Sequence, residues 1–148
     1  MINFRCKPFH ELTALQLYAI MALRQEVFIV EQNCPYLDAD GKDMKSWHLM
    51  GYDADGKLVA YARLLPRGVS YDHFTSIGRI ATSPAARRTG AGRALMKAAL
   101  DWMEQQFPGE NIKISAQTYL RAFYESFGFV VSGEEYLEDD IPHFPMVR

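Results

Sequence analysis

The stretch ARRTGAGRALM at residues 86–96 combines glycines, whose backbone is not covered by a side chain, with positive charge and the start of an apolar helical pattern. The residues that supply these features are Gly90, Gly92, Arg87, Arg88 and Arg93. A helix N-terminus has unpaired N–H groups and the positive end of the helix dipole, and both favour a bound phosphate. The alternative is a glycine turn before a surface helix whose arginines are merely solvated.

Neither common nucleotide-binding motif fits this stretch. A Walker A loop requires G-x-x-x-x-G-K-[ST], and RRTGAG has neither the length nor the lysine. The dinucleotide fingerprint requires a third glycine where this sequence has Leu95. Three arginines at one helix end make a small footprint for nucleic acid, and the net charge of −2 adds no general attraction to it.

Hydrophobic periodicity predicts the elements that precede this loop. Strand-like alternation covers residues 2–6, and apolar residues at helical spacing predict a helix over 13–31 that begins with a capping box from Thr13 to Gln16. The strands SWHLMGY and KLVAYARLL flank the turn DADG and predict a hairpin. FTSIGRIAT then predicts a strand that ends just before the loop.

The elements after the loop follow the same rules. One apolar face from Gly92 to Phe107 predicts a helix of about five turns, which Pro108 ends. NIKISAQ predicts a strand, TYLRAFYESFG a short helix and FVVSGEEY another strand. PHFPMVR predicts a final edge strand, where Pro145 is tolerated. The order predicts a single α/β domain over residues 1–148 with a mixed sheet.

Composition narrows the class of protein. Apolar residues make up 49% and charged residues 23% of the 148 residues, which is typical of a globular domain. Two cysteines, Cys6 and Cys34, are interpreted as free thiols in a reducing compartment. There is no signal-like segment and no run long enough for a membrane span, so we expect a soluble cytoplasmic protein with no membrane partner.

A second motif, AFYESFGF at residues 122–129, follows the glycine loop after one helix and one strand. Arg87-x-x-Gly90-x-Gly92 together with Tyr124, Glu125, Gly128 and Phe129 resembles the signature of the GNAT superfamily of acyl-CoA N-acyltransferases. The resemblance covers essentially the whole chain. The segments LRQEVFIVEQNCPYLDADGKD and YLEDDIPHFPM are similar to the ElaA-like branch of that superfamily.

The resemblance implies a GNAT-type mixed, mostly antiparallel sheet flanked by helices, with central parallel strands that splay apart. It also implies acetyl-CoA as a cosubstrate, with the pyrophosphate on the backbone of the glycine loop and the pantetheine arm paired with the preceding strand. The implied binding residues are Ile80, Ala81, Thr82, Arg87, Arg88, Thr89, Gly90, Ala91, Gly92, Arg93, Gln117 and Phe123. Gln117 stands where family members often have asparagine.

Tyr124 matches the general acid of the family, which would protonate the departing thiolate. The alternative is that its ring only packs on a helix rich in aromatic residues. A free backbone N–H near Ala81 could polarise the thioester carbonyl. For the base that deprotonates the amine, the candidates are Glu31, His143 and a water that relays to either, because FTSIGRIAT lacks a glutamate.

Three further histidines show no metal-ligand spacing, so we expect no metal. The aspartates at 38, 40 and 43 are expected to be solvated or to attract a cationic amine. Together these features predict an N-acetyltransferase acting in a ternary complex on a small-molecule or protein amine, and they leave a homodimer open. The alternative function is an acyl-CoA-binding sensor or partner-binding module with weak catalysis.

Overall fold

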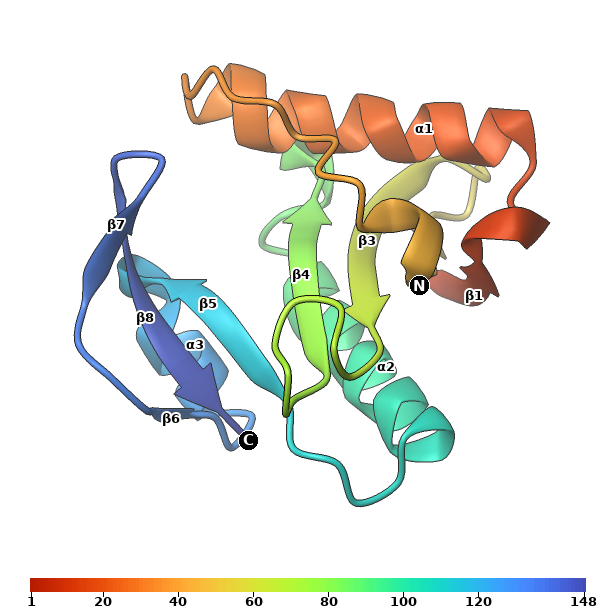
Figure 1. Cartoon of the computed structure of the whole chain (residues 1–148). Coiled ribbons are helices and arrows are strands. Elements are labelled where there is room, and N and C mark those ends of the chain that lie inside the picture. The colour runs from red at the N-terminus through yellow and green to blue at the C-terminus, as the bar shows by residue number, and fades with distance from the viewer.

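The computed structural model describes residues 1–148 as two sheets with helices packed on them (Figure 1). The first part contains β1 (Asn3–Pro8), α1 (Ala14–Arg24), η2 (Gln25–Glu31), β2 (Trp47–Tyr52), β3 (Leu58–Leu65) and β4 (Ser76–Thr82). The second contains α2 (Ala91–Gln106), β5 (Lys113–Gln117), α3 (Arg121–Glu125), β6 (Val130–Val131), β7 (Tyr136–Glu138) and β8 (Ile141–Val147). Short 3-10 turns are η1 (Phe9–Glu11), η3 (Asp43–Lys45), η4 (Pro84–Ala86) and η5 (Thr118–Leu120).

The first sheet has the antiparallel order β1-β2-β3-β4. Its predicted hairpin is confirmed, because β2 pairs with β3 around a turn in which Asp53 accepts hydrogen bonds from the N–H groups of Asp55 and Lys57. The predicted capping box is also confirmed: the Thr13 hydroxyl accepts from Gln16 N–H at 3.1 Å, and the Gln16 side chain accepts from Thr13 N–H at 2.9 Å. The predicted helix over 13–31 continues beyond α1 as the π-helical η2.

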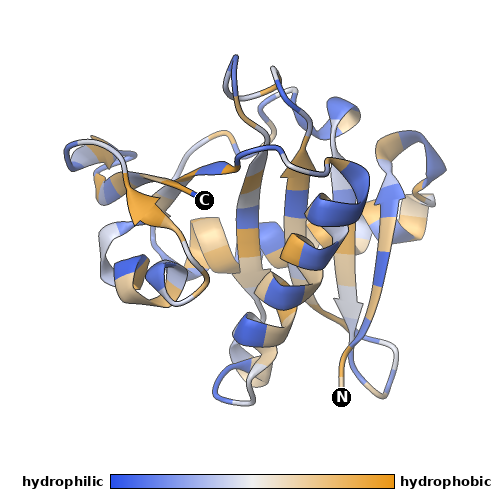
Figure 2. Ribbon diagram, turned by 90° about the horizontal axis from the view of Figure 1, so that it is seen from below, coloured by the Kyte–Doolittle hydropathy of each residue, from blue (hydrophilic) through white to orange (hydrophobic).

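Helices cover both faces of the first sheet. On one face α2 buries Leu95, Met96, Ala99 and Met103, as its apolar face predicts. On the other face α1 and η2 bury Ile20, Leu23 and Val27 against Met50 and Tyr61. Hydrophobic and hydrophilic residues alternate along the helices and along several of the strands (Figure 2). No helix here combines the length and the apolar character that crossing a bilayer requires.

The second sheet corrects two sequence-based predictions. β8 is not an edge strand, because it pairs with β5 on one side and with β6 and β7 on the other. Pro145 is tolerated because its carbonyl accepts from Ser132 N–H, and its missing N–H faces the same side, where β6 has ended. FVVSGEEY is not one strand either, since it divides into β6 and β7 around Gly133.

Gly133, in the gap between β6 and β7, lies close to Pro145 of β8. A side chain there would place Cβ 2.9 Å from Cγ of Pro145. After it, β7 and β8 form a hairpin in which Glu138 pairs with Ile141. The two linking residues, Asp139 and Asp140, have φ of 50° and 62°, which is the backbone of a type I′ turn.

β4 and β5 run parallel but are joined only at their start. Thr75 pairs with Ile112, with Thr75 N–H donating to Asn111 at 3.2 Å and Lys113 N–H donating to Thr75 at 2.9 Å. Beyond this bridge the two strands belong to separate sheets. The implied splay of the central parallel strands is therefore confirmed.

Candidate active site

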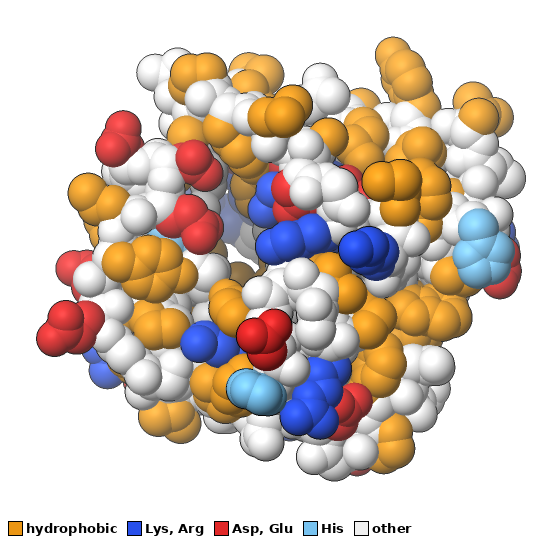
Figure 3. All heavy atoms as spheres, viewed as in Figure 1, with side chains coloured by type: hydrophobic (Ala, Val, Ile, Leu, Met, Phe, Trp, Pro, Cys, Tyr) orange, Lys and Arg blue, Asp and Glu red, His pale blue; other side chains and the backbone are white.

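The splayed strands border a cavity of about 940 Å³, visible as a hollow in the surface (Figure 3). Its walls come from η2, the segment that follows it, β4, β5, the α3 region and the β7–β8 hairpin. Most of the predicted site residues meet here. Those that line the cavity are Glu31, Ile80, Ala81, Thr82, Arg87, Gly92, Gln117, Phe123, Tyr124 and His143.

The remaining predicted residues, which are Arg88, Thr89, Gly90, Ala91 and Arg93, do not line the cavity. They form the turn and the first helical residues at the start of α2. Gly90 is the N-cap with φ of 84°, a left-handed conformation that favours glycine, and no side chain caps the helix. The first turn of α2 contains no acidic residue. Its N–H groups are thus left without a side-chain partner, as an anion site requires.

The side chains of the predicted arginines point in different directions. Arg93 donates to the Ser126 hydroxyl at 3.2 Å and lies 4.6 Å above the ring of Phe127. Arg88 is exposed and makes no hydrogen bond through its side chain. Arg87 binds back toward the cavity, where it donates to the Thr82 carbonyl at 3.0 Å.

Glu31 pairs with Arg87 across the cavity mouth. Both guanidinium ends of Arg87 donate to the two carboxylate oxygens, at 2.5 and 2.6 Å. These hydrogen bonds hold the pKa of Glu31 below its usual value. A carboxylate with a lowered pKa is a weaker proton acceptor. The arginine that engages Glu31 is 56 residues away in the sequence.

A bulge in β4 sets which backbone groups face the cavity. Arg79 has φ of 50°, and the pairing of β3 with β4 shifts register opposite it. The N–H of Ser83 donates to Val59 on β3, so the backbone groups of Thr82 and Ile80 face the opposite side, toward the cavity. Those of Ala81 face β3. The sequence predicts a free N–H near Ala81. The nearest amides that face the cavity are those of Ile80 and Thr82.

Tyr124 is packed, yet its hydroxyl is unpaired within the protein. The residue is 6% exposed, and its ring makes edge contacts with Phe123 and Phe129. It lines the cavity, and none of the protein's hydrogen bonds involves its hydroxyl. Burial raises the pKa of Tyr124 above its usual value. The phenol therefore stays protonated to higher pH and remains a hydrogen-bond donor.

His143 is held in one orientation on the opposite wall. Its Nδ1 lies 2.7 Å from the Ile141 carbonyl, which can only accept, so Nδ1 carries the proton. The lone pair of the neutral imidazole is therefore on Nε2, 3.6 Å from the Glu138 carboxylate. The ring stacks on Tyr136 and lies opposite Gln117 in the strand pairing. The His143 side chain is 7% exposed and that of Glu138 is 52% exposed.

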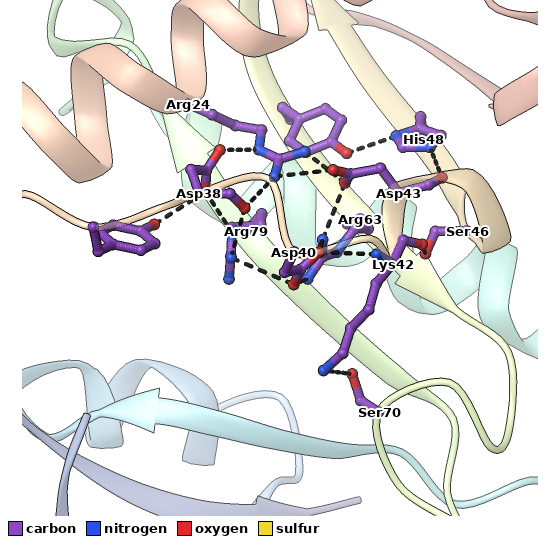
Figure 4. Close-up of polar contacts among 12 residues, drawn as sticks. Arg24, Asp38, Asp40, Lys42, Asp43, Ser46, His48, Arg63, Ser70 and Arg79 are labelled. Atoms are coloured by element: carbon purple, nitrogen blue, oxygen red, sulfur yellow. Dashed lines mark hydrogen bonds and ion pairs between the residues drawn. The ribbon is translucent and has the colours of Figure 1, made fainter. Parts of the chain in front are cut away.

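A network of buried ion pairs holds the segment between η2 and β2 (Figure 4). Arg24 is fully buried and donates to Asp38 at 2.8 Å and to Asp43 at 2.7 Å. Arg63 on β3 bridges Asp40 and Asp43, and Arg79 in the β4 bulge binds Asp38. The expectation of solvated aspartates is wrong for Asp38 and Asp43, which are buried.

The same network removes most of the predicted attraction for a cationic amine. Three aspartates face three arginines, so their charges balance. Burial raises the pKa of Asp40, but hydrogen bonds from Arg63 and from the Lys42 backbone outweigh it and lower the pKa to about 2. Asp40 is thus charged at neutral pH, and the stability that it contributes is lost only as the pH falls below about 4 toward 2.

Sequence patterns missed several of these residues. Nothing near Arg24, Arg63 or Arg79 indicates that they converge on one acidic segment, because their partners are 14 to 41 residues away. Glu138 is one acidic residue among several in EEYLEDD, and only the hairpin brings it to His143. An arginine inside an otherwise apolar strand, as in KLVAYARLL, was the one available signal of a buried ion pair.

The comparisons with known proteins agree with this geometry. A family described as Acetyltransferase (GNAT) domain matches residues 23–148. The chain belongs to the GNAT acetyltransferase family. Protein ElaA of Escherichia coli is 41% identical to this GNAT protein over 150 residues, covering 100% of the chain and 97% of ElaA. The ElaA crystal structure matches with a TM-score of 0.92, covering 100% of this chain and 99% of that one.

A second solved structure is also similar to this GNAT chain. It is an acyl-CoA N-acyltransferase from Pseudomonas aeruginosa, 45% identical, with a TM-score of 0.94. The match covers 100% of this chain and 99% of that one. The ElaA-like resemblance and the GNAT fold predicted from the motifs are therefore confirmed.

The ion-pair network gives a prediction about stability. Arg24→Met removes one partner and leaves Asp38 and Asp43 short of a buried counter-charge, so the free energy of unfolding should fall by about 3–5 kcal/mol. The control is Lys97→Met, which breaks the exposed Lys97–Asp101 pair and should change it by less than about 0.5 kcal/mol. Urea unfolding measures both. Equal, small effects would contradict the structural role of the network.

Proposed function

We propose that the protein is an acetyl-CoA-dependent N-acetyltransferase, in which an amine attacks the thioester directly within a ternary complex. The observation that carries the proposal is the splay of β4 and β5 beside a cavity that contains Tyr124. The family description supports acetyl as the transferred group, and the name of the Pseudomonas relative supports acyl-CoA as donor. A cytoplasmic location is part of the proposal and is consistent with the absence of a disulfide between the two cysteines.

The proposed coenzyme A site follows the predicted residues from α2 to β4. The uncapped N–H groups of Ala91, Gly92 and Arg93 would bind the pyrophosphate, with Arg88 free to add charge. The cavity-facing backbone of Ile80 and Thr82 would pair with the pantetheine amides in the manner of an added strand. Arg87 has a different proposed role: its pair with Glu31 fastens η2 to the loop.

The proposed reaction requires that the amine loses a proton, that the departing thiolate gains one, and that a hydrogen-bond donor stabilises the carbonyl oxygen. A bond forms between the amine nitrogen and the carbonyl carbon, while the C–S bond breaks and its electron pair leaves with sulfur. A cavity-facing amide of β4 is suited to stabilise the intermediate oxyanion. Tyr124 donates its proton to the thiolate and recovers one from solvent.

His143 is the proposed base in place of Glu31. Its Nε2 has the free lone pair and the residue lines the cavity, whereas Glu31 is engaged by Arg87. The imidazolium formed would lie beside Glu138, whose side chain reaches solvent. The proton that His143 takes from the amine would then pass through the Glu138 carboxylate to solvent.

The first test concerns the anion site. In Gly92→Asp the new carboxylate in the first turn favours the helix dipole but repels a bound phosphate, so stability should hold while coenzyme A affinity falls at least tenfold. A Cβ at this position would meet Phe123 no closer than 3.9 Å, so Gly92→Ala is the matched control and should keep binding. Calorimetry with coenzyme A measures both. Tight binding by Gly92→Asp would place the pyrophosphate elsewhere.

The second test concerns Tyr124 and follows thiol release from acetyl-CoA with a panel of amines. Tyr124→Phe should lower kcat by roughly ten- to ten-thousand-fold. The melting temperature should barely move, because the hydroxyl has no partner to lose. Since the pKa of Tyr124 is raised, its ionisation should not limit the wild-type rate below about pH 10. Unchanged turnover in the variant would favour the acyl-CoA-binding alternative.

The third test separates the two candidate bases. His143→Gln should lower kcat/KM by roughly a hundredfold or more. Glu31→Gln should lower it much less, because it only weakens the tie to Arg87. Steady-state kinetics on both variants decide between them. A hundredfold loss in Glu31→Gln alone would reverse the assignment, and small effects in both variants would indicate water.

A further inference from the structure

The segment of Asp38 to Asp43 contributes one positive charge that the ion-pair network does not balance. Its three aspartates are matched by Arg24, Arg63 and Arg79. The remaining charge is Lys42, which lines the cavity and forms no ion pair. This wall of the cavity is therefore cationic, the reverse of what its sequence suggests.

Lys42 points away from the network (Figure 4). Its ammonium donates to the Ser70 hydroxyl at 3.2 Å and makes no other hydrogen bond. Arg79 lies on the same side, and its Nη1 donates no hydrogen bond within the protein while Nε and Nη2 bind Asp38. Two cationic side chains that line the cavity thus retain donors without a partner.

The opposite wall has the opposite charge. Glu138 and Asp139 of the β7–β8 hairpin line the cavity, and neither pairs with an arginine or lysine. Acidic side chains stand on one rim of the hollow and basic side chains on the other (Figure 3). His143, the proposed base, lies on the acidic side. A molecule that spans the cavity would meet anions near the base and cations at its other end.

We propose that the acceptor is an amine that also carries an anionic group, such as a carboxylate, which Lys42 binds. This inference rests on the proposed acetyl transfer at the same site. The amine would approach His143 and Glu138, and its anionic end would accept charge-assisted hydrogen bonds from Lys42, with Arg79 beside it. A diamine would instead place a second cation against Lys42.

The reaction balances for such an acceptor as for any primary amine. The nitrogen gains the acetyl group and loses one proton to His143, while the sulfur keeps the electron pair of the C–S bond and gains one proton. The anionic group takes no part in bond making. Its contribution is binding and orientation, so it should appear mainly in kcat/KM.

The experiment uses probe amines of equal length that differ at the far end. These are γ-aminobutyrate, butylamine and putrescine, together with the five-carbon set δ-aminovalerate, pentylamine and cadaverine. Thiol release from acetyl-CoA is measured for wild type, Lys42→Met, Lys42→Glu and the control Lys45→Met, whose lysine is exposed and forms no ion pair. Wild type and Lys45→Met should prefer the amino acid by roughly ten- to a hundredfold in kcat/KM.

The two Lys42 variants test whether the charge of this side chain sets the preference among the acceptors. Lys42→Met should remove the preference, and Lys42→Glu should transfer it to the diamine, with unchanged acetyl-CoA affinity in both. Release that does not depend on end charge, or a preference that survives both substitutions, overturns the inference and leaves the transferase intact. Absence of release from every amine, with acetyl-CoA still bound, overturns the proposed function and the inference with it.

Discussion

The structure depends on the separation of β4 from β5 after a single bridge at Thr75 and Ile112. Two neighbouring parallel strands would ordinarily satisfy each other's backbone groups, and here they diverge instead. Most of the length of both strands thereby lines a cavity. A ligand with its own amide groups can take the place of the missing strand, and the pantetheine arm of coenzyme A has that chemistry. The bulge at Arg79 adds to the effect by changing which β4 amides face inward.

Arg79 also links the bulge to the charge of the acceptor side. Its backbone is in the left-handed region, and its side chain binds Asp38 and Asp40. The same aspartates engage Arg24 on α1 and Arg63 on β3. A buried network of this kind costs desolvation and is stable only when its members are paired. The network attaches the segment of Asp38 to Asp43 to α1, β3 and β4, and this fixes the position of Lys42 in the cavity wall.

Local signals accounted for much of the fold. Thr13 and Gln16 lie within one helical turn, and the DADG turn specifies its own hairpin, so neighbouring residues contain all the information. The glycine loop and the Tyr124 segment were recognisable because both motifs occur at the family spacing. These patterns located eight of the residues that line the cavity, from Ile80 to Tyr124.

Contacts between residues far apart in the sequence determine the features that sequence patterns could not predict. The sequence predicts β8 as an edge strand, where Pro145 is tolerated, yet β6 ends early enough to make a proline tolerable in the middle of the sheet. The pairs Arg87–Glu31 and Arg24–Asp43 join residues far apart in the chain, and each changes how a candidate site residue behaves. Hydrophobic periodicity contains no information about such ion-pair partners.

A crystal structure with coenzyme A bound tests the central claim most directly, which is that the splayed strands form the binding site. The account predicts pyrophosphate oxygens within hydrogen-bonding distance of the N–H groups of Ala91 to Arg93. It also predicts the pantetheine along β4 and the sulfur beside the Tyr124 hydroxyl. Coenzyme A bound at another surface, with the cavity between β4 and β5 left to solvent, would contradict it.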